Sequence, residues 1–154
     1  MIPYSRQSIN ENDINEVIKV LKSEMITQGP IVEKFEKTIC SYTSSNYSVL
    51  TNSATSALHI SCLALGLSKG DILWTSPNSY VASANVGLLC NAKVDFVDID
   101  PENYNMCPTA LSIKLKNAEK LGQLPKIVMP VHFAGQSCDM IKIKKLSEKY
   151  GFKI

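Results

Sequence analysis

The sequence lacks the signals that mark several large classes of protein. No apolar run approaches the roughly 20 residues that a membrane-spanning helix needs, and no basic region followed by an apolar stretch opens the chain. The net charge is only +2, with 16 Lys and Arg against 14 Asp and Glu. A charge this small does not indicate nucleic-acid binding. We therefore expect no membrane insertion, no secretion and no nucleic-acid partner.

The sequence also lacks closely spaced pairs of cysteines. It contains five cysteines, an odd number, which are widely spaced and form no Cys-x-x-Cys motif; they are Cys40, Cys62, Cys90, Cys107 and Cys138. This usage is typical of reduced thiols, not of a disulfide framework or a zinc site. It predicts a cytoplasmic protein.

Three common nucleotide-binding and catalytic motifs are missing. No Gly-x-Gly-x-x-Gly follows the first expected strand of the sheet, and no Gly-x-x-x-x-Gly-Lys-Ser/Thr or Gly-x-Ser-x-Gly occurs. The sequence therefore disfavours a generic dinucleotide-binding domain, a P-loop NTPase and an α/β-hydrolase.

What is present is the pattern of a globular domain of 154 residues, 45% of them hydrophobic. Apolar residues at helical spacing predict a helical segment over residues 1–45, with helices near 14–21 and 32–42. From residue 46 onward, strands and helices alternate. We expect strands at 47–51, 72–76, 93–99 and 126–131 and one that begins at Phe152, with helices at 54–65, 79–89, 111–118 and 140–150.

This alternation predicts an α/β fold, a three-layer αβα arrangement around a mostly parallel sheet. Ligands of such folds bind at the carboxyl ends of the strands. The turns at 53–55, 76–80 and 132–136 all follow expected strands. We expect these turns to lie along one edge of the sheet.

The turn at Ser53, Ala54 and Thr55 is a candidate phosphate cradle. A helix that begins here presents free N–H groups and the positive end of its dipole, and two hydroxyl groups add donors. An ordinary helix cap by Asn52 or Ser53 explains the same residues at least as well. The segment by itself leaves both interpretations open.

Other polar residues follow the expected strands. Tyr80 has a ring suited to a flat heteroaromatic ligand, although a tyrosine packed at a helix start is an equal alternative. His132 and Gln136 offer hydrogen bonds, and His132 is more typical of a structural histidine. Asp98 and Asp100 are more typical of an Asp-Pro turn than of a metal site, so we expect no metal.

Seven segments, taken in order, resemble the sugar aminotransferases of the DegT/DnrJ/EryC1/StrS family, fold-type I enzymes that depend on pyridoxal 5′-phosphate (PLP). The segments are Ile2-Pro-Tyr-Ser, Thr27-Gln-Gly-Pro, Asn52-Ser-Ala-Thr-Ser-Ala-Leu-His, Thr75-Ser-Pro, Tyr80-Val-Ala-Ser-Ala-Asn, Val94-Asp-Phe-Val-Asp-Ile-Asp-Pro and Pro130-Val-His-Phe-Ala-Gly-Gln-Ser-Cys-Asp. The resemblance covers nearly the whole chain. It implies that residues 46–154 are the first part of the PLP-binding large domain, without its C-terminal part and the small domain.

The resemblance also implies roles for particular residues. Ala54 and Thr55, beside Ser53, would bind the PLP phosphate, Tyr80 would stack on the pyridine ring, and Gln136 would lie near the ring substituents. The residues implied to contact a nucleotide sugar or to line its entrance are Tyr4, Glu24, Met25, Ile26, Thr27 and Ala54.

Within the family, the chain is most similar to the transaminases of pseudaminic acid synthesis, which use L-glutamate to aminate C4 of UDP-4-keto-6-deoxy-N-acetyl-altrosamine. Family members are dimers, so the resemblance implies a homodimer. The family's Schiff-base Lys and the Asp that pairs with the pyridine nitrogen would both follow Ile154. We therefore expect no catalytic residue in the 154-residue chain, and no activity from it alone. The alternatives are a PLP dehydratase, in which His replaces that Lys, and a noncatalytic nucleotide-sugar-binding or dimerisation fragment.

Overall fold

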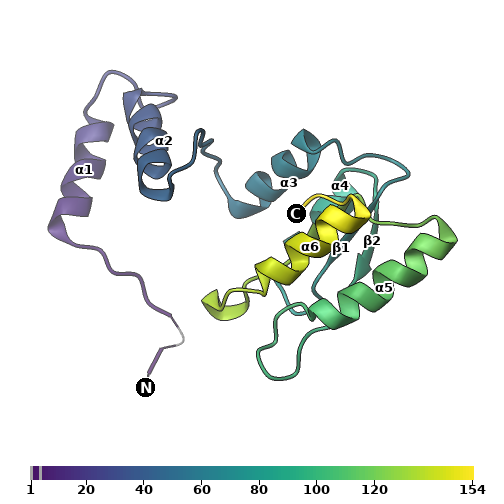
Figure 1. The fold of residues 1–154 in the computed structure, drawn as a ribbon. Helices are drawn as coiled ribbons and strands as arrows, with labels where there is room; N and C mark the ends of the chain where they lie inside the picture. Colours follow the sequence, from purple (N-terminus) through teal and green to yellow (C-terminus); the bar gives the residue numbers. More distant parts are fainter. Residues whose placement is uncertain (1, 4) are drawn as a thin grey trace. The chain divides into compact units, whose positions relative to one another are not determined.

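The computed structural model describes residues 2–3 and 5–154. They form two compact units, a helical unit (Met1–Leu50) and a sheet unit (Thr51–Ile154). The helical unit contains α1 (Glu11–Leu21) and α2 (Pro30–Thr43) (Figure 1). The sheet unit contains α3 (Ala54–Ala64), β1 (Ile72–Thr75), α4 (Ala82–Leu89), β2 (Lys93–Phe96), α5 (Pro108–Leu121), β3 (Ile127–Met129), the 3₁₀ turn η1 (Phe133–Gly135) and α6 (Met140–Tyr150).

Both helices of the helical unit are confirmed, and their starts have local causes. Asn10 caps α1 by accepting hydrogen bonds from the amides of Asn12 and Asp13, and the Asp13 carboxylate accepts the Asn10 amide at 2.9 Å. Pro30 begins α2 at a position where no N–H donor is needed. Neither helix contains a buried residue, so the apolar stripes of this unit remain largely exposed.

The sheet has the order β2-β1-β3, and both pairs are parallel. Leu73 in β1 is in register with Val94 in β2 and with Ile127 in β3. Lys153 forms a further parallel bridge with Ile127, where a strand from Phe152 was expected. The mostly parallel sheet is therefore confirmed.

Alternate residues of the strands point into two separate cores. Leu73 and Ile127 pack with residues of α3 and α4, such as Val86, on one face of the sheet. Trp74 and Val128 pack on the other face, with residues of α5 and α6 that include Leu111, Leu115 and Ile143. Because successive side chains of a strand point to opposite faces, this division gives helix, sheet and helix layers. The three-layer αβα prediction is confirmed.

The strand expected at residues 47–51 does not form. Val49 is 71% exposed, and the amide of Leu50 donates to Glu36 Oε1 of α2 at 2.9 Å. A strand is stabilised by a neighbouring strand, and no segment in the described part of the chain pairs with this one. The strand predicted at residues 47–51 is therefore wrong.

Other expected boundaries shift for local reasons. β2 ends at Phe96 because the chain turns and Ile99 pairs in the antiparallel direction with Met106. β3 ends at Met129 because Pro130 has no amide to donate. Helix α4 begins at Ala82, not Ser79, because a tight turn precedes it, with the Ser83 amide bonded to the Tyr80 carbonyl at 3.1 Å.

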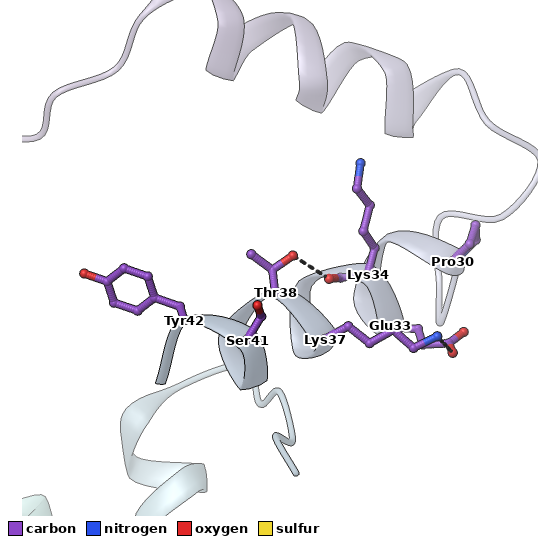
Figure 2. Close-up of a pocket in the computed structure, with 7 residues that line it drawn as sticks. All are labelled: Pro30, Glu33, Lys34, Lys37, Thr38, Ser41 and Tyr42. Atoms are coloured by element: carbon purple, nitrogen blue, oxygen red, sulfur yellow. Dashed lines mark hydrogen bonds and ion pairs between the residues drawn. The ribbon is translucent and has the colours of Figure 1, made fainter. Parts of the chain in front are cut away.

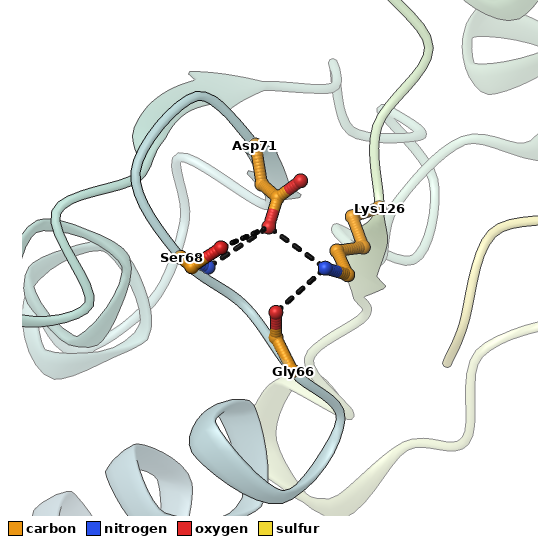
Figure 3. Close-up of polar contacts among 4 residues, drawn as sticks. All are labelled: Gly66, Ser68, Asp71 and Lys126. Carbon is orange, nitrogen blue, oxygen red and sulfur yellow. Dashed lines mark hydrogen bonds and ion pairs between the residues drawn. The ribbon is translucent and has the colours of Figure 1, made fainter.

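A polar cluster joins three segments at the edge of the sheet where the strands begin (Figure 3). The ammonium of Lys126, just before β3, donates to the Gly66 carbonyl at 2.6 Å and to Asp71 Oδ2 at 2.8 Å. The amide and hydroxyl of Ser68 donate to the same carboxylate oxygen. The cluster ties the loop after α3 to the starts of β1 and β3, which is a structural role.

This cluster predicts a loss of stability in acid. The hydrogen-bonded Lys126 ammonium is the main reason that the pKa of Asp71 lies below its ordinary value of 3.8. Ser68 adds to this lowering, and partial burial of the carboxyl opposes it. Since the pKa of Asp71 is lower in the folded state than in the unfolded state, its stabilisation is complete above about pH 5 and is lost as the pH falls through the folded-state pKa.

We expect Asp71→Asn to lower the free energy of unfolding at pH 7 by about 0.5–1 kcal/mol, because both partners are partly exposed to solvent. The difference between the two proteins should be smaller at pH 2.5 than at pH 7. Urea unfolding at both pH values measures it. A difference that stays constant with pH would contradict this role of the carboxylate.

Candidate functional site

The start of α3 is capped by its own side chains. Ser53 is the N-cap, and its Oγ accepts the Ser56 amide at 3.2 Å. The Ser56 hydroxyl in turn donates to Asn52 Oδ1 at 2.8 Å. The cap interpretation of this segment is therefore confirmed for Ser53.

The cap leaves two donors open. In the described part of the chain, the amides of Ala54 and Thr55 have no acceptor, as expected for the first two positions of a helix. The first turn of α3 contains no acidic residue, whereas that of α1 contains Glu11 and Asp13. The positive end of the α3 dipole is therefore not neutralised by its own side chains, which suits an anion.

Tyr80 and Gln136 lie at the edge of the sheet where the strands end. Tyr80 follows β1 and is 78% exposed, and Gln136 follows β3 and is also exposed. No hydrogen bond engages either side chain among the described residues. Because β1 and β3 are parallel neighbours, the loops that follow them emerge at the same edge.

Helix α3 begins toward this edge as well. Its C-terminus leads through the Gly66–Asp71 loop to the start of β1, and the Gly66 carbonyl is bonded to Lys126 at the start of β3. Helix α3 packs against α4 on this face of the sheet. An 11-residue helix is about 16 Å long, which is enough to span strands of three or four residues. The topology thus brings Ala54, Thr55, Tyr80 and Gln136 to one edge, and no direct hydrogen bond joins them.

The loop after β3 is fixed by two residues. His132 Nδ1 accepts the Cys138 amide at 3.1 Å, so this histidine serves the loop structure. Asn105, which the sequence did not single out, bonds the same loop from the β2–α5 connection. An asparagine in the polar run Asn103-Tyr-Asn reads as an ordinary turn residue, so no local signal marked it.

The remaining predicted contacts belong to the helical unit. Glu24, Met25, Ile26 and Thr27 are exposed in the α1–α2 connection, where a Cβ on Gly29 would clash with the Met25 carbonyl oxygen. This close approach explains the glycine. Tyr4 lies outside the described residues.

A shallow hollow on α2 is shown in Figure 2. It is lined by Pro30, Glu33, Lys34, Lys37, Thr38, Ser41 and Tyr42. Glu33 and Lys37 form an exposed ion pair at 2.6 Å, and Thr38 bonds the Lys34 carbonyl. Glu33 and Lys37 thus pair with each other, and Thr38 bonds its own helix. None of the residues that line the hollow belongs to the predicted site.

The described residues offer little support for a reactive thiol, a metal site or a membrane-spanning helix. All five cysteines are free, and burial, aided by nearby Cys90, raises the pKa of Cys62 to about 11. Among residues 2–3 and 5–154, no three His, Cys, Asp or Glu side chains are grouped to hold a metal ion. Within the same residues, no helix has the length and apolar character to cross a membrane.

Comparison with known proteins agrees with this architecture. The uncharacterized protein MJ1066 of Methanocaldococcus jannaschii is 39% identical over 97% of this chain and 37% of its own length. The UDP-4-amino-4,6-dideoxy-N-acetyl-beta-L-altrosamine transaminase of Campylobacter jejuni (strain 81-176) is 38% identical over 100% of this chain and 40% of its own length. The PLP form of Spr1654 from Streptococcus pneumoniae matches with a TM-score of 0.86 and 30% identity, over 99% of this chain and 38% of that one.

The chain therefore spans about two fifths of the length of these relatives. A family model matches residues 7–154, which is nearly all of the chain. The chain belongs to the DegT/DnrJ/EryC1/StrS aminotransferase family.

Proposed function

We propose that this chain forms the first part of a PLP-dependent aminotransferase that acts on a nucleotide-linked 4-keto-6-deoxy sugar. The observation that carries the proposal is the pair of open amides of Ala54 and Thr55, at the edge of the sheet that also holds Tyr80 and Gln136. When bound, PLP carries the amino group between substrates, and its ring withdraws electrons from the reacting carbon.

The residues at this edge suit such a cofactor. The two amides and the Thr55 hydroxyl are hydrogen-bond donors for a phosphate dianion, at the positive end of a helix without acidic residues in its first turn. Ser53 shapes the turn through its cap. Their part in the reaction is to anchor the cofactor by its phosphate.

Tyr80 and Gln136 would hold the ring. The exposed phenol ring of Tyr80 offers a π-surface for stacking on a pyridine ring. The Gln136 amide can both donate and accept hydrogen bonds, which suits the polar ring substituents. Together they would orient the ring and limit the access of water to it.

The similarity to the Campylobacter jejuni transaminase supports a choice of substrate. We propose UDP-4-keto-6-deoxy-N-acetyl-altrosamine as the acceptor and L-glutamate as the amino donor, in a cytoplasmic homodimer. Tyr4, Ala54 and the loop of Glu24, Met25, Ile26 and Thr27 would contact the nucleotide sugar or line its entrance.

The proposal is tested with pyridoxamine 5′-phosphate (PMP), because PMP binds without a covalent bond to the protein. We expect isothermal titration of the 154-residue chain to show PMP binding, and pyridoxamine, which lacks the phosphate, to bind at least about tenfold more weakly. Equal affinities for the two, or no PMP binding, would contradict the proposal. Binding of UDP-N-acetylglucosamine without any binding of PMP would instead favour a noncatalytic nucleotide-sugar-binding fragment.

A further inference from the structure

Asn105 is a buried polar residue whose amide group is fully used. The side chain is only 3% exposed. Its Nδ2 donates to the carbonyls of Gln136 at 3.1 Å and Ser137 at 3.2 Å, and its Oδ1 accepts the Phe133 amide at 2.9 Å. One side chain thus holds both sides of the η1 turn in the loop that follows β3.

Asn105 is itself held in place. Its amide donates to Asn103 Oδ1 at 2.9 Å, and its carbonyl accepts the Asp100 amide at 2.8 Å. The neighbouring Tyr104 adopts a positive φ of 62°, and its ring meets the Phe133 ring edge-on, with 6.1 Å between the centroids. We call Asn105 and its bonds to Phe133, Gln136 and Ser137 the clamp. It is therefore anchored in the connection between β2 and α5.

The clamped loop needs such support. Ala134 lies in the left-handed region, with φ 50° and ψ 27°, and Gly135 follows with φ 83°. For a residue with a Cβ, this conformation costs about 1–2 kcal/mol. Within the turn, the bonds from the Gly135 amide to the His132 carbonyl and from the Gln136 amide to the Phe133 carbonyl oppose that cost. The Asn105 bonds across the turn add to this support, as does the bond from the Cys138 amide to His132 Nδ1.

We propose that Asn105 is a positioning residue for the proposed cofactor site at the edge where the strands end, and that it acts through Gln136. The amide of Asn105 holds the Gln136 carbonyl from the buried side, while the Gln136 side chain remains exposed and without a protein partner among the described residues. Asn105 fixes the backbone from which that side chain extends, and so aims it at a ligand bound at this edge. The inference rests on the proposed function, because that ligand is PLP or PMP.

The first test examines the clamp without any ligand. Asn105→Asp keeps the shape but places a carboxylate oxygen against two carbonyls, and Asn105→Ala removes the clamp without adding a charge. In the 154-residue chain, we expect amide hydrogen exchange at Phe133 and Gln136 to become at least about tenfold faster in both variants. Exchange in β1 should not change, and Asn117→Ala, on the exposed side of α5, is the matched control. Unchanged exchange at Phe133 and Gln136 would overturn the clamp.

The second test asks whether the clamp acts through Gln136. We expect Asn105→Ala and Gln136→Ala each to weaken PMP binding by about fivefold, the loss of one net hydrogen bond. The double variant should bind no more weakly than either single variant, because both remove the same contact. A purely structural Asn105 would give additive losses, which would overturn the positioning role.

Failure of the proposed function has a different signature. If the unsubstituted chain bound no PMP, the proposed function and the positioning role would both be overturned, while hydrogen exchange would still report the clamp itself. If PMP bound but Gln136→Ala bound it equally well, only the positioning role would be overturned.

Discussion

Leu115→Ala is expected to lower the free energy of unfolding by about 2–5 kcal/mol. Leu115 lies on α5, is 0% exposed and packs in the core that includes Trp74, Val128 and Ile143. Removal of its side chain takes buried apolar groups away and leaves a cavity between α5, α6 and the sheet. Urea unfolding monitored by circular dichroism measures the change.

The same helix provides a matched control. Leu121 is 70% exposed on α5, so Leu121→Ala should change the free energy of unfolding by less than about 0.5 kcal/mol. Leu115→Met, which nearly conserves volume, should cost less than about 1.5 kcal/mol. Equal costs at positions 115 and 121 would show that the α5 face of the sheet does not form this core.

Ala54→Pro is expected to weaken PMP binding by about 10- to 100-fold while the fold is kept. Proline removes the amide of the first helical position, one of the two open donors, and a hydrogen bond to a charged group is worth about 1.5–3 kcal/mol. Isothermal titration with PMP measures the loss. Pyridoxamine should lose little affinity, because it has no phosphate to bind.

The fold should tolerate this substitution. Helices α2 and α5 already begin with Pro30 and Pro108, and proline is favoured at this position. Ser53 is extended, with φ −160° and ψ 156°, which is the conformation that a following proline requires. The thermal unfolding midpoint should therefore be unchanged or slightly higher.

Thr55→Val separates the hydroxyl from the amide. It keeps both open amides and removes one donor, so we expect only about a fivefold loss of PMP affinity. If Ala54→Pro bound PMP as well as the unsubstituted chain, the amides at the start of α3 would not hold the phosphate.

Much of the fold follows from short-range patterns. The helical spacing of Leu111, Leu115 and Ala118 predicted α5, and the alternation of strands and helices along the chain predicted α6. The small hydroxyl residues before α3 predicted both a cap and open amides, and Ser53 forms the cap. These features depend on bonds between residues a few positions apart, which the sequence displays directly.

The features that it missed depend on distant partners. The segment 47–51 was predicted to be a strand, but its Leu50 amide is bonded to Glu36, 14 residues earlier. Asn105 reads as a turn residue until it meets Gln136, 31 residues later. Apart from the segment 47–51, the sequence by itself determined the order of helices and strands, the parallel sheet and the helix start suited to an anion. Only the tertiary structure decided which strand finds a partner and which asparagine holds the Gln136 loop, because both depend on hydrogen bonds between segments that folding alone brings together.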